Sequence, residues 1–462
     1  MAKALLIAPP QEGLVGKRSR KFHRCFPPLS LLLTASLLRQ EGWEVELNDL
    51  NADRSLTSDQ VQKTAEQCEL VVLTTNPYAD WQCPTFAVQS IFEFARHLPS
   101  ERLVLTGNHG THFPGTVLRE THASIVVREE PEWAIAEIAQ AFRSKGDFSK
   151  IQGISYRVND QNHHNPQRLL QHMDELPAPA YDLVDLKNYH YELLGGNFAI
   201  LETSRGCPYS CNFCNLTMFQ DGYRKRSPEK FLNELDELVE KHGCRSLYIF
   251  DLEFTINRKM VKAVCKHLIE KDYAGRYGFR WACQTRADSV KEDLLKEMKR
   301  SGCSLIHFGV EAGNPEIIKN TQKKIVKERI QEGIRATQDA GIQTAAFFIF
   351  GHPGESMENY QETLDFALDL SPSFASFHPF LSFPGSPLFT EKYGKGPYWE
   401  DPIRQDVTYF TPEQEEQTSQ FVKKAYVKFY IRPRYIWQLL TRGDWGLYLR
   451  QLKLFGAFLT QG

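Results

Sequence analysis

Short apolar runs alternate with amphipathic helical patterns along most of the chain. In the N-terminal part the apolar runs predict strands at 3–8, 44–49, 69–74, 103–106 and 125–127. The patterns between them predict helices at 29–40, 85–97 and 132–143. Strands that alternate with helices favour βαβ units and a parallel sheet, in which ligands bind at the carboxyl ends of the strands. We therefore expect a Rossmann-like domain over 1–145.

The periodicity weakens over 146–197, which contains the Pro-rich segment 176–179, and this stretch is predicted to be a linker. Regular alternation returns over 198–390, with strands predicted at 199–203, 246–250, 279–283, 305–310, 344–350 and 374–380. Six βα units are too few for a closed eight-stranded barrel, so we expect a partial (βα)6 barrel with its chemistry at the strand ends.

The last segment, 391–462, interleaves aromatic and basic residues and is predicted to be helical, most clearly over 429–459. Its favoured role is a docking helix that closes the barrel mouth. Contact with an apolar substrate or a membrane surface is the alternative.

Composition narrows the function classes. The 462 residues carry 55 Lys and Arg against 57 Asp and Glu, and a net charge of −2 gives no support to nucleic-acid binding. The longest apolar run, 27–38, is shorter than the roughly 20 residues that span a bilayer, so no transmembrane segment is expected. The chain start shows no cleavage signal, which favours a cytoplasmic protein. The ten cysteines therefore do not indicate a disulfide scaffold.

Three cysteines gather on one loop after the first strand of the predicted barrel. Cys207, Cys211 and Cys214 have CxxxCxxC spacing, and no fourth cysteine stands nearby at matching spacing. Three thiolates can ligate three irons of a [4Fe-4S] cluster and leave one iron open to another ligand. Structural zinc would need four closed ligands, and no paired CxxC or His motif follows. Three buried thiols without a metal are the alternative, which this spacing at a strand end disfavours.

On these residues the sequence resembles the radical S-adenosylmethionine (SAM) superfamily over about 198–389. The resemblance implies that the three cysteines bind the cluster and that Phe213, the aromatic residue before the third cysteine, belongs to the SAM site. Asp251-Leu252-Glu253 occupies the place of the family's Gly-Gly-Glu segment, which contacts the SAM amino group. Both glycines are replaced, so the resemblance implies Glu253 and, more weakly, Asp251.

Three later strand ends complete the predicted SAM site. Arg286 follows the third strand, Glu311 ends the fourth in a segment that resembles the ribose-contacting one, and Gly351 lies in a stretch that resembles the adenine motif. Each residue alone is a weak signal, because a solvated Glu or Arg at a strand end is common. Their order along the chain makes the set a strong one.

A parallel sheet ahead of this core resembles the cobalamin-binding subclass of the superfamily. Domains with a histidine lower ligand carry Asp-x-His-x-x-Gly, whereas the corresponding stretch 49–54 lacks both the histidine and the glycine. The resemblance still implies cobalamin, with contacts from loops after the strands. The predicted contacts are Asn51, Thr74, Thr75, Gly107, Asn108 and His109, the last as a contact rather than a cobalt ligand. The alternative is a domain that covers substrate and binds no cobalamin.

The resemblance is to the family that holds the anaerobic magnesium-protoporphyrin ester cyclase and methylases of pigments and lipids. It implies a radical SAM enzyme that methylates an unactivated carbon of a small or lipophilic substrate, with an external electron donor such as flavodoxin or ferredoxin. A non-methylating oxidoreductase or cyclase on a tetrapyrrole-like substrate is the second expectation. An iron–sulfur binding protein is the third, and the open iron disfavours it.

Overall fold

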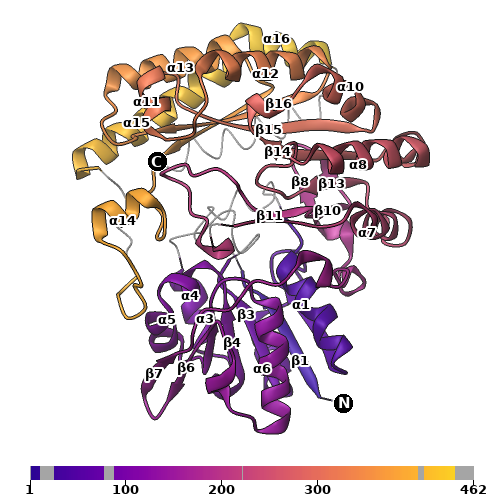
Figure 1. Cartoon of the computed structure of the whole chain (residues 1–462), viewed down its shortest axis with the longest axis vertical. Helices are drawn as coiled ribbons and strands as arrows, with labels where there is room; N and C mark the ends of the chain where they lie inside the picture. The colour runs from indigo at the N-terminus through magenta and orange to yellow at the C-terminus, as the bar shows by residue number, and fades with distance from the viewer. Residues whose placement is uncertain (1, 11–24, 77–87, 221, 404–409, 443–462) are drawn as a thin grey trace.

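The structure, a computed structural model, describes residues 2–10, 25–76, 88–220, 222–403 and 410–442. Two α/β units lie one on the other, the N-terminal unit in indigo and purple below and the second unit in magenta, orange and yellow above (Figure 1). Each unit is built around one large sheet. The predicted fold class, a Rossmann-like domain followed by a partial (βα)6 barrel and a helical tail, is confirmed.

The N-terminal sheet has seven strands in the order β2-β1-β3-β4-β5-β6-β7, of which the first five in the chain are parallel. The strand order reverses between β1 and β3, which is where doubly wound sheets bind ligands. The strands are β1 (Lys3–Ala8), β2 (Glu44–Asp49), β3 (Leu70–Thr74), β4 (Leu103–Thr106), β5 (Ile125–Val127), β6 (Ile154–Val158) and β7 (Gln161–His164).

Helices bury apolar side chains on both faces of this sheet. Helices α1 and α6 pack on one face, and α2, α3 and α5 pack on the other. Their bounds, with the short α4, are α1 (Leu29–Gln40), α2 (Ser58–Glu66), α3 (Gln89–Ala95), α4 (Asn108–His112), α5 (Pro114–Thr121) and α6 (Glu132–Ser144). The predicted helix 85–97 is observed as α3, and its residues 85–87 lie outside the described residues.

Part of the segment expected as a linker extends the N-terminal sheet. β6 pairs antiparallel with β5, and β7 pairs antiparallel with β6. The sequence pattern hides β7 because this edge strand reads Gln-Asn-His-His and has no apolar face. The turn between β6 and β7 does carry a sequence signal, the pair Asn159-Asp160. These two residues take φ values of +47° and +61°, as the central residues of a tight hairpin turn do.

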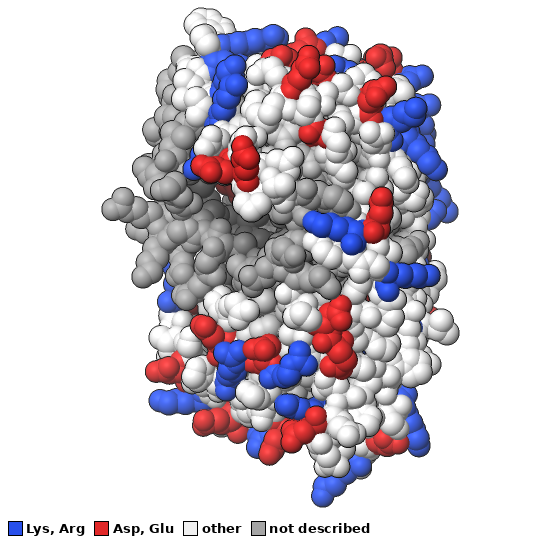
Figure 2. All heavy atoms as spheres, turned by 90° about the vertical axis from the view of Figure 1, so that its left-hand side faces the viewer, with Lys and Arg blue, Asp and Glu red and all other residues white. Residues whose placement is uncertain are grey.

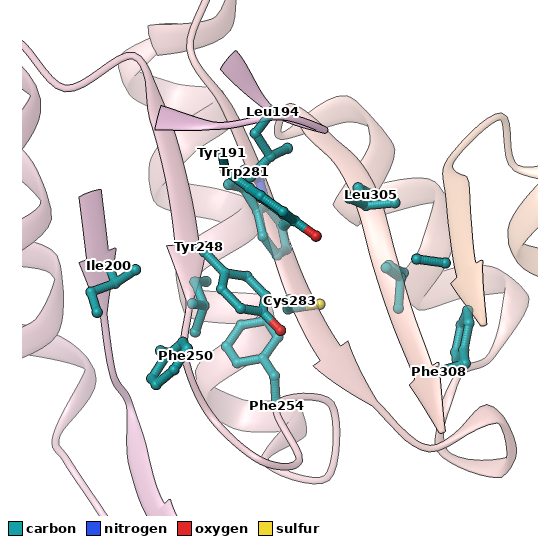
Figure 3. Close-up of a cluster of buried hydrophobic side chains, with 14 of the residues drawn as sticks. Tyr191, Leu194, Ile200, Tyr248, Phe250, Phe254, Trp281, Cys283, Leu305 and Phe308 are labelled. Atoms are coloured by element: carbon teal, nitrogen blue, oxygen red, sulfur yellow. The ribbon is translucent and has the colours of Figure 1, made fainter. Parts of the chain in front are cut away.

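The second sheet has six parallel strands in chain order, β10-β13-β14-β15-β16-β17. Aromatic and aliphatic side chains of its first strands fill the core that Figure 3 shows, where Tyr248 lies in the second strand of the sheet and Phe250 directly follows that strand. The strands are β10 (Phe198–Leu201), β13 (Ser246–Ile249), β14 (Arg280–Thr285), β15 (Cys303–Glu311), β16 (Gln343–Phe350) and β17 (Phe374–Pro379).

Helices lie along the outer side of this sheet (Figure 1). They are α7 (Pro228–Glu240), α8 (Arg258–Lys271), α9 (Tyr273–Tyr277), α10 (Glu292–Arg300), α11 (Pro315–Asn320), α12 (Lys327–Asp339) and α13 (Met357–Leu370). Two short hairpins pair β8 (His190–Tyr191) with β9 (Gly195–Gly196) and β11 (Ser204–Gly206) with β12 (Tyr223–Lys225).

The helical tail covers the open edge of the partial barrel. The Tyr430 hydroxyl donates to the Ala375 carbonyl at 2.7 Å and accepts from the Ala375 N–H at 3.0 Å, and the Tyr426 hydroxyl accepts from the Phe377 N–H at 3.2 Å. These bonds satisfy backbone groups that an edge strand would otherwise leave unpaired. The tail helices are α15 (Pro412–Tyr430) and α16 (Pro433–Arg442), so helix begins well before the predicted start at 429, and residues 443–459 lie outside the described residues.

The segment between β17 and α15 returns to the N-terminal domain. It begins with α14 (Pro387–Tyr393), whose Phe389 packs with Tyr398 and with Phe113 of the N-terminal domain. The Gly115 N–H donates to the Trp399 carbonyl at 2.8 Å. The two domains are therefore joined by this segment as well as by the chain between them.

Two further features concern the surface charges on one face and the helices. Lys and Arg lie interspersed with Asp and Glu over the face drawn in Figure 2. Among the described residues, no helix is both long enough and apolar enough to cross a bilayer.

Candidate functional site

The cysteine loop follows β11 and is fastened to the rest of the barrel by backbone and amide bonds. The Asn212 N–H donates to the Thr321 carbonyl at 3.1 Å, and its side-chain amide donates to the Asn320 carbonyl at 2.7 Å. Gly206 takes φ +82°, and a Cβ there would lie 1.8 Å from the Gly222 carbonyl oxygen. Only glycine therefore fits immediately before Cys207.

Asp251 acts on the turn that leads into this loop. Its buried carboxylate accepts hydrogen bonds from the backbone N–H groups of Thr203 and Ser204 at 2.6 and 3.1 Å and from both of their hydroxyls. This carboxylate therefore holds the turn between β10 and β11 in place. Asp251 is fully buried, and its direct contact with SAM stays a prediction.

The three thiols lie partly exposed and near one another. Burial raises the pKa of Cys207 to about 11, and burial together with the neighbouring Cys211 and Cys207 raises the pKa of Cys214 to about 12. Cations would therefore be needed to hold these groups as thiolates. No three His, Cys, Asp or Glu side chains in the described part of the chain are placed to share one metal ion. A cubane cluster does not require this, since each thiolate binds a different iron, so the loop fits such a cluster.

Two of the predicted SAM residues are buried carboxylates that face the thiols. The Glu311 carboxylate accepts a 2.6 Å bond from Lys323, which also donates to the Gly309 carbonyl at 2.6 Å. Glu311 takes φ +68°, a conformation that costs energy in a non-glycine residue. Burial lowers and the Glu311 carboxylate raises the pKa of Lys323, and the net change is upward. The end of β15 thus carries a preformed ion pair, whose two opposite charges sum to zero.

Glu253 lies across from this pair. Its carboxylate accepts bonds from the Arg286 N–H at 2.9 Å and from the Thr285 hydroxyl at 3.2 Å, and burial raises its pKa to about 7. Both Glu253 and Lys323 act electrostatically on Cys211. Two acidic groups, Glu253 and Glu311, and two basic groups, Lys323 and Arg286, therefore act on Cys211, and an amino-acid ligand requires charges of both signs.

The side chain of Arg286 supports the loop from beneath. Its guanidinium donates two 2.9 Å bonds to Asp288 and one of 2.6 Å to the Lys323 carbonyl. It also lies 4.0 Å from the ring centroid of Tyr209 in the cysteine loop. The structure therefore gives this predicted SAM residue a supporting role, and its own contact with SAM stays a prediction.

Phe213 and Gly351 meet at the ring of His352. The Phe213 and His352 centroids are 5.8 Å apart, and Glu355 accepts bonds from the N–H groups of Gly351 and His352 at 2.6 and 2.9 Å. Burial lowers the pKa of His352 to about 4, and its Nε2 is buried without a hydrogen-bond partner. Sequence reasoning missed His352, Lys323 and Tyr209, although His352 lies within the adenine-like motif.

The predicted cobalamin residues of β3 and β4 form one hydrogen-bonded group. The Asn76 side-chain oxygen accepts from the Asn108 N–H at 3.1 Å, and the His109 Nδ1 shares a 3.2 Å bond with the Thr75 hydroxyl. Thr74 accepts from the Asn76 N–H at 3.2 Å. The structure therefore brings together Thr74, Thr75, Gly107, Asn108 and His109.

This group fits an uncharged ligand rich in amides. The Thr106 hydroxyl and the Asn108 side-chain oxygen are buried without a hydrogen-bond partner. Gly107 takes φ +116°, and a Cβ there would lie 2.6 Å from the Thr75 hydroxyl and 2.9 Å from the Asn76 side-chain oxygen. Free acceptors beside a position that only glycine can fill suit a cofactor whose rim carries amide donors, as that of cobalamin does.

Asn51 lies two strands away, at the end of β2. Its amide donates to the Pro9 carbonyl at 2.9 Å and to Asp49 at 3.2 Å. Asp49 is buried, and burial raises its pKa while the Tyr189 hydroxyl donates to it at 3.0 Å. Both hydrogen atoms of the Asn51 amide are thus directed at the protein.

Helix α4 links the two groups of strand-end residues. It begins at Asn108, and its Thr111 hydroxyl lies 3.1 Å from the Met218 sulfur while a 3.2 Å bond joins His112 to Asn215, the residue after Cys214. The carboxyl ends of the N-terminal strands therefore face the cysteine loop. The sequence did not predict this helix, because its residues Asn-His-Gly-Thr-His are weak helix formers.

A buried ion cluster forms a second link. Arg205 is fully buried and donates to Glu130 at 2.8 Å, Glu132 at 2.7 Å and Glu202 at 2.8 Å. Arg224 also contacts Glu130. Since Glu130 and Glu132 follow β5 whereas Arg205 precedes Cys207 by two residues, this cluster ties the N-terminal domain to the cysteine loop.

The chain is similar in sequence to known proteins. Residues 201–367 match the Radical SAM superfamily. The chain is 29% identical to an uncharacterized methyltransferase of Pyrococcus horikoshii over 447 residues, which cover 94% of this chain and 93% of that protein. It is 31% identical to the anaerobic magnesium-protoporphyrin IX monomethyl ester cyclase of Cereibacter sphaeroides over 302 residues, 64% of this chain and about half of that cyclase (49%).

Among solved structures, the chain resembles the cobalamin-dependent SAM radical enzyme OxsB with aqua-cobalamin and SAM bound. The TM-score is 0.71 at 18% identity, over 100% of this chain and 72% of that one, which establishes a shared fold. The matched segment contains the whole cysteine loop and the strand ends that carry Glu253, Arg286 and Glu311. Residues 201–367, which carry the cysteine loop, are therefore similar to the Radical SAM superfamily.

Proposed function

We propose that this chain is a cobalamin-dependent radical SAM enzyme that methylates an unactivated carbon of a small or lipophilic substrate. The observation that carries the proposal is the contact between α4 and the residues just after Cys214. It sets the amide-lined strand ends of the N-terminal sheet against the cysteine loop. A methyl donor and a radical source need this proximity, because both must reach one substrate carbon.

In this proposal Cys207, Cys211 and Cys214 hold three irons of a [4Fe-4S] cluster. When bound, the cluster supplies the electron that cleaves SAM, and cobalamin supplies the methyl group that the substrate carbon receives.

The chain itself binds and orients these groups. Glu253 and Glu311 accept from the ammonium and ribose groups of SAM, and Lys323 lies beside its carboxylate. His352, neutral near pH 7, offers its unpartnered Nε2 to the adenine against Phe213.

On the other side of the interface, five residues after β3 and β4 hold the corrin rim. The Asn108 side-chain oxygen accepts from a corrin amide, and Gly107 lets the macrocycle approach the backbone. Asn51 would stand in the place of a histidine ligand and would supply no imidazole to cobalamin, while its amide donates to Pro9 and Asp49.

A non-methylating cyclase is the second candidate, because the chain is 31% identical to the cyclase of Cereibacter sphaeroides. An external donor such as flavodoxin or ferredoxin would supply electrons in either case.

We propose a cytoplasmic location, supported by nine described cysteines that are all free thiols.

The test is anaerobic reconstitution with iron, sulfide and hydroxocobalamin, followed by product analysis with SAM labelled in its methyl group. Methylated product, S-adenosylhomocysteine and 5′-deoxyadenosine together support the methyltransferase. Deoxyadenosine without methyl transfer, most tellingly with magnesium-protoporphyrin IX monomethyl ester as substrate, would favour the cyclase. An intact cluster that never cleaves SAM would reject both.

A further inference from the structure

The two faces of the barrel sheet differ in exposure along the last strands. On β16, Phe348 and Phe350 are fully buried under the outer helices, whereas Phe347 and Ile349 are partly exposed. On β17, Phe377 is buried while His378 is exposed. Because side chains alternate along a strand, these exposed residues share the inner face, opposite the helices that Figure 1 shows along the outer side.

Strand register sets these inner residues side by side. Gln284 on β14 lies opposite His307 on β15, and Gly309 lies opposite Phe347 on β16. Phe347 in turn lies opposite Ser376 on β17, and Ile349 lies opposite His378. These positions therefore form one row across four strands, which is buried at His307 and becomes exposed toward His378.

A row of aromatic rings crosses this surface. The Tyr248 and His307 centroids are 5.1 Å apart, those of His307 and Phe347 are 5.6 Å apart, and those of Phe347 and His378 are 6.3 Å apart with ring planes at 28°. The row is buried at Tyr248, which Figure 3 shows among the core side chains, and opens toward His378. The Ser376 hydroxyl fixes the His378 ring through a 2.7 Å bond to its Nε2.

We propose that this inner face, defined by Gln284, His307, Phe347, Ser376 and His378, recognises the substrate, and that the substrate presents an uncharged planar ring with hydrogen-bonding groups. This inference rests on the proposed function and names the substrate class for that site. Aromatic rings stack on Phe347 and His378, and the Gln284 amide and the Ser376 hydroxyl meet polar groups at the ring edge.

The charge pattern selects an uncharged ring. From Gln284 across to His378 the inner-face residues include no Lys, Arg, Asp or Glu. The two cationic side chains nearest this face are already paired, Arg286 with Asp288 and Lys323 with Glu311. A carboxylate or phosphate on the ring would thus lose its hydration without gaining a cation.

The surface also lies within reach of the proposed SAM site. The Gly309 carbonyl accepts from Lys323, the partner of Glu311, and Gly309 is the register neighbour of Phe347. Adjacent strands are about 4.8 Å apart. A ring stacked on Phe347 therefore lies one strand away from the residues that would hold SAM.

The experiment measures binding of indole and of indole-3-carboxylate to the cluster-, SAM- and cobalamin-loaded enzyme by equilibrium dialysis. We expect saturable indole binding and at least tenfold weaker binding of the carboxylate. Phe347→Leu and His378→Asn should each weaken indole binding about fivefold. Met357→Leu, on the outer helix α13, is the matched control and should change nothing, while iron content and the melting temperature report folding of every variant.

Equal or tighter binding of indole-3-carboxylate would overturn the inference. So would indole binding that neither variant weakens, or wild-type enzyme that cleaves SAM and retains cobalamin but binds no indole. Failure of the proposed function looks different, because wild-type enzyme with an intact cluster would then form no 5′-deoxyadenosine.

Discussion

The carboxyl ends of the two sheets face each other, and the ends of β3 and β4 carry the opposite kind of side chain from the strand ends around the cysteine loop. Around the cysteine loop they are charged, buried and paired, as Glu311 is with Lys323. At the ends of β3 and β4 they are uncharged amides and hydroxyls bonded to one another, such as Asn76 and Thr75. The difference teaches what each sheet is prepared to hold, because paired charges suit a zwitterion and a metal cluster whereas neutral donors and acceptors suit a macrocycle bordered by amides.

The largest effect is expected from replacing a cysteine of the metal-binding loop, compared with replacing a cysteine outside it. Cys211→Ala should abolish 5′-deoxyadenosine formation and the iron–sulfur absorption band, because one of three thiolates is lost. Cys244 is fully buried outside the loop, so Cys244→Ala is the control and should keep both. Absorption spectra, iron analysis and product chromatography measure the outcome. Loss of the cluster in the Cys244 variant alone would refute the assignment.

The second prediction concerns the charged residues around the cysteine loop. Glu311→Gln should weaken SAM binding to the iron-loaded enzyme by about 2 kcal/mol, roughly 30-fold, because it removes a charged acceptor and leaves Lys323 buried without its counterion. Titration calorimetry measures the affinity, and iron content should not change. Glu316→Gln, on the exposed side of α11, is the control. Unaltered SAM affinity in Glu311→Gln would place SAM elsewhere.

The third prediction adds a methyl group among the uncharged residues at the ends of β3 and β4. Gly107→Ala should weaken cobalamin retention about tenfold, because a Cβ meets the Thr75 hydroxyl at 2.6 Å in a backbone conformation unfavourable to alanine. Gly42→Ala controls for the backbone, since Gly42 also takes a positive φ, +75°, but nothing lies within 4 Å of its Cβ. Gel filtration and the cobalamin absorbance give the retained fraction. Equal loss in both variants would mean general strain, and no loss in Gly107→Ala would argue against this cradle.

The smallest effect concerns Asn51. Asn51→Ala removes hydrogen bonds to Pro9 and Asp49 and should lower cobalamin affinity by about 1 kcal/mol, roughly fivefold. The paramagnetic resonance spectrum of the reduced cobalt should lack protein nitrogen splitting in wild type and variant alike. Nitrogen splitting in the wild type would show that an imidazole, with His109 the first to examine, binds the metal.

The two sheets and the cysteine loop could be predicted from the sequence, because the ends of strands follow from short-range patterns. The order of apolar runs predicted both parallel sheets, and the CxxxCxxC spacing indicated a cluster loop. The pattern could not indicate α4 or β7, whose residues are polar and whose stability comes from tertiary contacts.

The sequence also could not predict which side chains bond to each other when they are far apart along the chain. Nothing near Lys323 marks it as the partner of Glu311, since the two are twelve positions apart in the sequence and α11 lies between them. Asp251 shows the converse, because its place in the motif suggested SAM while its four hydrogen bonds hold the turn before the cysteines. A motif fixes where a residue stands, whereas its bonding depends on neighbours that are distant in sequence.

The buried ion cluster around Arg205 has a thermodynamic consequence. Separating the two domains would leave the Arg205 guanidinium without Glu130 and Glu132, and breaking buried pairs of this kind costs about 3–5 kcal/mol. The domains should therefore unfold in one cooperative transition. A ligand that binds only the folded state raises the stability of the whole unit, so cobalamin held by one sheet would protect the cysteine loop on the other from unfolding.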